Sequence, residues 1–162
     1  MKWRLISSAV LSMAAIVFGQ AEPTTGTLVG RVFAIAKDGE TKPARIAPVY
    51  VATGADRISL QQSVDAALAK RADDLKSNTD PEQACLLASM SVHEAVKSDS
   101  SIQTANTDED GTFDLPKLKA GVYTVVVIGA ADGYQSVWYS TTTVVPGKRQ
   151  KIKLSEPALS CQ

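Results

Sequence analysis

The sequence predicts a mainly β protein, a seven-strand β-sandwich with two helices inserted between strands 2 and 3. Three observations lead to this fold class. Residues 107–134 hold two strand-like segments separated by turn residues. Shorter segments of the same kind lie toward both ends of the chain. Between them, residues 55–98 repeat apolar side chains at the spacing of a helix rather than of a strand.

The central hairpin begins with the turn residues Asp108–Gly111. Phe113 and Leu115 then alternate with polar residues, which is the period of a half-buried strand. We expect Pro116 to end this strand, because proline cannot donate a hydrogen bond to a neighbouring strand. The run Val122–Ile128 is largely apolar on both faces, so we expect each face to be covered.

Five further strands complete the predicted set. They are expected at residues 27–36, 43–53, 102–107, 136–145 and 150–154. In the last of these, Ile152 and Leu154 are the side chains that we expect to be buried.

Residues 55–98 predict two antiparallel helices. The first repeats Leu60, Val64, Ala67 and Leu68 at helical spacing. A break at residues 77–79 precedes the second helix, where Asp80 suits the N-cap, Pro81 the first helical position and Gln83 a capping box. The apolar face of the second helix consists of small residues, Ala84, Ala88, Val92 and Ala95. We expect both helices to cover the outward side chains of Val122, Val126 and Ile128.

The central hairpin also resembles a known family. Its pattern T-D-x-x-G-x-F-x-L-x-x-L-x-x-G-x-Y-x-V-x-V, followed by a Gly-Tyr pair, is similar to the carboxypeptidase regulatory-like domain. The matching positions are Thr107, Asp108, Gly111, Phe113, Leu115, Leu118, Gly121, Tyr123, Val125, Val127, Gly133 and Tyr134. The resemblance implies a transthyretin-like, or prealbumin-like, β-sandwich. The metallocarboxypeptidase activity associated with the family's name belongs to a separate catalytic domain, and the resemblance says nothing about the inserted helices.

Residues 1–21 have the pattern of a secretory signal peptide, with a basic start, the apolar run Leu5–Phe18 and small residues up to Ala21. The apolar run is shorter than the roughly 20 residues that cross a bilayer. We therefore expect residues 22–162 to form one exported domain without a transmembrane segment, in the periplasm or the extracellular space. The chain carries 17 basic and 17 acidic residues without an evident basic cluster, so nucleic acid is not an expected partner.

Export also bears on the two cysteines, Cys85 and Cys161, because exported proteins fold in an oxidising compartment. We predict a disulfide between them, which would fix the C-terminal tail to the second helix. Two unpaired thiols, or a bridge from Cys161 to another chain, are the alternatives.

Two motifs are weak candidates for metal chemistry. His93-Glu94 begins like a zinc-protease motif, but Lys97 stands where the second histidine is required, and His93 is the only histidine of the chain. Asn106–Gly111 resembles the start of a calcium-binding EF-hand loop, but Lys117 replaces its final glutamate. A helix-surface histidine and a β-turn are the favoured interpretations. We expect no catalytic residues, no metal and no cofactor, and hence no enzyme.

Tyr134, Trp138 and Tyr139 form the one aromatic cluster. Strand alternation places Trp138 in the core with Val144 and points Tyr139 outward, while an exposed aromatic edge could stack on sugar rings. The predicted function is a non-catalytic binding or structural module of the cell envelope that contacts a protein or a glycan there. Carbohydrate binding through these three aromatic residues is the alternative.

Overall fold

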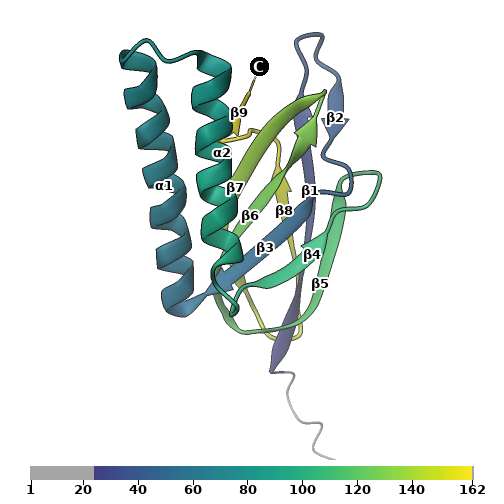
Figure 1. Ribbon diagram of the computed structural model, residues 1–162. Coiled ribbons are helices and arrows are strands. Elements are labelled where there is room, and N and C mark those ends of the chain that lie inside the picture. Colours follow the sequence, from purple (N-terminus) through teal and green to yellow (C-terminus); the bar gives the residue numbers. More distant parts are fainter. Residues whose placement is uncertain (1–23, 162) are drawn as a thin grey trace, which may run out of the picture.

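The computed structural model describes residues 24–161, which form two packed β-sheets with a pair of helices on the outer face of one of them (Figure 1). The protein is therefore a mainly β sandwich with two helices, as the sequence predicts. The predicted signal peptide, residues 1–21, lies outside the described residues. Neither helix within residues 24–161 is both long and apolar enough to cross a membrane.

The first sheet is built around its longest strand. It contains β1 (Thr25–Ile35), β2 (Thr41–Pro43), β5 (Thr112–Lys119) and β8 (Arg149–Leu154). The central β1 pairs antiparallel with β5 and β2 and parallel with β8. Gly30 is consequently paired with Phe113 on one side and with Ile152 on the other. Strands from both ends of the chain thus meet in one sheet.

The second sheet is antiparallel throughout, with the order β4-β3-β6-β7-β9. Its strands are β3 (Pro48–Thr53), β4 (Gln103–Asn106), β6 (Gly121–Ala131), β7 (Tyr134–Val144) and β9 (Leu159–Ser160). The described residues contain nine strands rather than the predicted seven, because two short edge strands, β2 and β9, join the seven expected ones.

The expectation that Pro116 ends its strand is wrong, since β5 continues through it to Lys119. The pairing with β1 shifts register between Gly26 and Leu28, opposite this proline. Lys117 adopts a positive φ of 60° at the same place. A local bulge therefore accommodates the missing backbone N–H and lets the strand resume pairing.

The two predicted helices are present, between β3 and β4. They are α1 (Gly54–Lys76) and α2 (Pro81–Lys97), and they lie side by side along the outer face of the second sheet (Figure 1). Asp80 caps α2, because its carboxylate accepts a hydrogen bond of 3.0 Å from the backbone N–H of Gln83. Asn78 takes a positive φ in the connection between the helices. The predicted N-cap, Asp80, and first helical residue, Pro81, of α2 are therefore confirmed.

The core has two layers. The layer between the sheets includes Leu28, Val32, Val49, Val51, Phe113, Val125, Val127 and Trp138. The layer between the second sheet and the helices includes Tyr50, Leu60, Val64, Ala88, Val92, Val126, Ile128 and Val137. The expected cover is present over Val126 and Ile128. It is absent over Val122, which is 43% exposed because it lies at the end of the sheet, beside the passage from β3 into α1.

Candidate functional site

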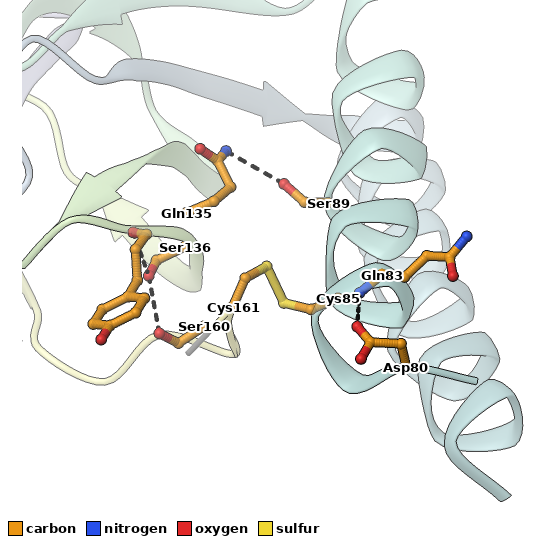
Figure 2. The surroundings of a disulfide bond; sticks show 9 residues. Asp80, Gln83, Cys85, Ser89, Gln135, Ser136, Ser160 and Cys161 are labelled. Atoms are coloured by element: carbon orange, nitrogen blue, oxygen red, sulfur yellow. Dashed lines mark hydrogen bonds between the residues drawn. A yellow bond between two sulfur atoms is a disulfide. The ribbon is translucent and has the colours of Figure 1, made fainter. Parts of the chain in front are cut away.

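The two cysteines form the predicted disulfide. Cys85 on α2 and Cys161 after β9 are joined by an S–S bond of 2.09 Å, with their Cα atoms 5.3 Å apart (Figure 2). The C-terminal tail also pairs with the edge of the second sheet, where Leu159 lies opposite Val137, and this pairing was not predicted from the sequence. The backbone N–H of Cys161 donates to the carbonyl of Gln135 at 2.9 Å. The bond therefore fixes an ordered edge strand to α2.

We expect removal of this disulfide by the double substitution Cys85→Ser and Cys161→Ser to lower the free energy of unfolding by about 2–5 kcal/mol. Urea denaturation checks the value. Reductant should lower the stability of the parent protein by a similar amount and leave the double variant unchanged. Equal stability of the parent and the double variant would show that β9 and its hydrogen bonds hold the tail without the bond.

The three aromatic residues named from the sequence do not share one surface. Trp138 is fully buried between the sheets, and its indole N–H donates to the carbonyl of Phe33 at 3.2 Å. Tyr139 is half-buried on the other side of β7, where its hydroxyl lies 3.3 Å from the carboxylate of Asp65 on α1. Burial raises the pKa of Tyr139, and the charge of Asp65 adds to this. Only Tyr134, which is 42% exposed, faces solvent to a large extent.

Tyr134 borders a small hollow between two hairpin tips. The hollow measures about 380 Å³, and its lining includes Ile35, Asp38, Lys42, Asp132 and Tyr134. The hydrogen bond and charge of Glu40 raise the pKa of Lys42, and the carboxylates of Asp38 and Asp132 raise it further. The Tyr134 hollow thus combines one exposed aromatic ring with charged hydrogen-bonding groups.

The turn that resembles an EF-hand has a structural role. Its Asp108 carboxylate accepts hydrogen bonds from the backbone N–H groups of Asp110 at 2.9 Å and Thr112 at 2.8 Å, and from the Thr112 hydroxyl. The hydrogen bonds from Thr112 hold the pKa of Asp108 below its usual value. The buried Thr107 hydroxyl donates to the Ala44 carbonyl at 2.6 Å, which ties the turn to the loop before β3.

These contacts engage the Asp108 carboxylate within its own turn. Within residues 24–161, no three His, Cys, Asp or Glu side chains lie close enough together to hold a metal ion. His93 is half-buried on α2 at the margin of an apolar hollow of about 230 Å³, beside Leu86 and Met90.

A third hollow lies on the outer face of the first sheet. The helices leave this face of the sheet uncovered (Figure 1). We call this surface the uncovered face; its outward side chains are Val29, Arg31, Thr112, Asp114, Arg149, Lys151 and Lys153. The hollow measures about 700 Å³, and its lining includes Val29, Arg31, Asp114, Arg149 and Lys151. The outward side chains of β8 are therefore all basic.

Two contacts position these cations. The guanidinium of Arg149 lies 2.8 Å from the carboxylate of Asp114 across the sheet. The charged groups of Arg31 and Lys153 lie 5.7 Å and 5.0 Å from the centre of the Phe33 ring, which is close enough for cation–π attraction. Arg31 lies far from β8 in the sequence and joins these cations only through the pairing of β1 with β8. The alternation of basic residues at 149, 151 and 153 was the available signal.

Comparisons with solved structures return sandwich proteins of low sequence identity. One is a Pseudomonas aeruginosa protein provisionally described as carbohydrate binding, with 17% identity, 85% of this chain and 92% of that chain covered, and a TM-score of 0.49. Another is the minor pilin of Streptococcus agalactiae, with 14% identity, coverage of 83% and 46%, and a TM-score of 0.43. The pilus backbone protein of Streptococcus pneumoniae has 14% identity, coverage of 80% and 41%, and a TM-score of 0.36. The chain thus spans less than half of both pilin chains.

A search of curated proteins finds no match. Among family models, that of the carboxypeptidase regulatory-like domain matches residues 79–155. The matched region runs from just before α2 to the end of β8, and it includes the signature hairpin of β5 and β6. The resemblance to the carboxypeptidase regulatory-like domain, predicted from the residues between Thr107 and Tyr134, is thereby confirmed.

Proposed function

We propose that this protein is an exported, non-catalytic binding or structural module of the cell envelope, and that the uncovered face is its contact surface. The observation that carries the proposal is the difference between the two outer faces of the sandwich. The apolar outer face of the second sheet is sealed by α1 and α2. The outer face of the first sheet stays open and holds a hollow of about 700 Å³.

The scaffold suits a module that works outside the cytoplasm. The Cys85–Cys161 disulfide forms and persists in oxidising compartments, which the periplasm and the extracellular space provide. It joins the end of β9, at the edge of the second sheet, to α2. The helices therefore serve to stabilise the fold. The first sheet is then free to present its outward side chains to a partner.

His93 and Asp108, the residues whose motifs suggested metal chemistry in the sequence, have surroundings that support a non-catalytic role. The only histidine, His93, lies on α2 beside apolar side chains. The carboxylate of Asp108 is engaged by its own turn. The uncovered face offers charged groups that bind and orient a ligand, and its Asp114 is already paired with Arg149.

Binding to isolated cell envelopes tests the proposal. We expect the purified protein to sediment with envelopes, and we expect Val29→Trp, which fills the hollow without changing charge, to abolish most of this binding. Gln62→Trp places the same bulk on the exposed side of α1 and should bind like the parent protein. If Val29→Trp folds and still sediments like Gln62→Trp, the uncovered face is not the contact surface.

Carbohydrate binding at the aromatic edge remains the second candidate, and the Tyr134 hollow is the observation that favours it. An exposed ring beside carboxylates and an ammonium group can stack on a sugar and hydrogen-bond to its hydroxyls. On a glycan array, Tyr134→Ala should lose the signal without loss of thermal stability. A glycan signal that survives this substitution would contradict a site at Tyr134.

A further inference from the structure

The cations of the uncovered face form an ordered row. Arg149, Lys151 and Lys153 alternate with inward residues along β8, so neighbouring charges are about 6.6 Å apart along the strand. Arg31 on β1 is paired with Lys153, at the roughly 4.8 Å separation of adjacent strands. Residues 24–161 contain four ion pairs, of which only that of Arg149 with Asp114 lies on this face.

This concentration of positive charge is local. The chain as a whole has equal numbers of basic and acidic residues, so its average charge does not explain the row. The two lysines of α1, on the opposite side of the protein, are paired within their own helix, Lys70 with Asp74 and Lys76 with Asp73. On the uncovered face, by contrast, β8 leaves two lysines free to meet negative charge from a partner.

We infer that the uncovered face binds an acidic polysaccharide, whose carboxylates lie along the row formed by Arg149, Lys151 and Lys153. The inference rests on the proposed function and names the partner of the same surface. A linear sugar acid presents negative charges at repeated intervals, which complements a row of cations. The hollow, at about 700 Å³, is large enough for a few sugar rings.

The other polar groups of the hollow favour a sugar over other anions. Asn106, Thr112 and Asp114 border the same hollow. The Asn106 amide can donate to and accept from sugar hydroxyls, while Thr112 donates to Asp108 and Asp114 is paired with Arg149, so that each of these two keeps only acceptor positions for a sugar. A polypeptide acid such as polyglutamate has no hydroxyl groups for them. Its binding would use the cations alone.

Lipid surfaces and nucleic acids fit this face less well. A bilayer binds proteins that insert apolar side chains, and none of the exposed large apolar residues of the described chain lines this hollow. Single-stranded nucleic acid requires aromatic rings for base stacking, and both Phe33 and Phe113 are buried. The charge row combined with sugar-binding polar groups therefore points to an acidic polysaccharide.

Calorimetric titration of the exported protein with polygalacturonate tests the inference. We expect binding that weakens about tenfold between 50 and 200 mM salt, because it depends on a few charge contacts. The double variant Lys151→Gln/Lys153→Gln should lower the affinity about tenfold or more. The matched variant Lys70→Gln/Lys76→Gln changes the net charge equally on α1 and should retain the parent affinity. Circular dichroism confirms that both variants are folded.

Several results would overturn the inference. Equal losses in the two double variants would show a net-charge effect without a site. Binding of polyglutamate, of a single-stranded oligonucleotide or of vesicles containing phosphatidylglycerol as tightly as polygalacturonate would remove the assignment to a sugar. If polygalacturonate does not bind while Val29→Trp still prevents sedimentation with envelopes, this inference fails and the proposed function stands. If that substitution has no effect either, both fail.

Discussion

Deletion of Asp56–Lys97, with the ends joined by a short Gly-Ser turn, is expected to make the protein aggregate. The deletion removes the cover from the outer face of the second sheet. Val126, Ile128 and Val137 are at most 4% exposed in the intact protein, and all three face the helices. A contiguous apolar sheet face of this kind is an aggregation site when it is left in water.

Size-exclusion chromatography with light scattering measures this outcome. The deletion also removes Cys85, so the full-length Cys85→Ser/Cys161→Ser variant is the control for loss of the disulfide. A soluble, folded monomer after the deletion would show that the helices are dispensable for the sandwich. A second deletion variant with Val126→Thr and Ile128→Lys separates the causes. It should regain solubility if exposed apolar area is the reason for aggregation.

The helical insertion was predictable because its signals are local. The spacing of Leu60, Val64 and Ala67 places them on one helix face, and all three are buried. Asp80 and Pro81 mark the start of α2 through their own backbone preferences. Neither inference needs knowledge of what the helices pack against, which is why both hold in the folded protein.

Features that depend on pairing between distant segments were harder to predict. The bulge beside Pro116 forms because β1 continues past it and offers further partners, which the proline itself does not reveal. The edge strand β9 pairs only two residues with β7, and the disulfide of the next residue joins it to α2, a partner that the tail itself does not reveal. In each case tertiary pairing overrides the local preference of the segment.

At the candidate site, too, some features follow from local sequence and others only from pairing between distant segments. Alternation along β8 identifies which side chains point outward, and this part was readable from residues 149–154. That β8 runs parallel to β1, which brings Arg31 beside Lys153, follows only from the topology of the sheet. For the aromatic residues, alternation separated Trp138 from Tyr139 correctly, but it did not show that α1 would reach Tyr139 through Asp65.

Substitution of Trp138 is expected to have the largest effect of any single change. Trp138→Ala removes a fully buried indole from the layer between the sheets and leaves the carbonyl of Phe33 without its donor. Truncations of this kind cost about 3–5 kcal/mol. That is a large share of the roughly 5–15 kcal/mol by which small domains are stable. Urea denaturation followed by circular dichroism measures the loss.

Two further variants identify the origin of the stability loss in Trp138→Ala. Trp138→Phe keeps an aromatic ring but has no N–H. It should lower the free energy of unfolding less than the alanine variant does. It still leaves the buried Phe33 carbonyl without its donor, and this loss alone should cost about 1–3 kcal/mol. Tyr139→Ala is the matched control on the next residue, where a half-buried ring at the margin of the helical layer should be lost at a smaller cost than Trp138. If Tyr139→Ala destabilises the protein as much as Trp138→Ala, then the layer between the sheets is not the one that dominates its stability.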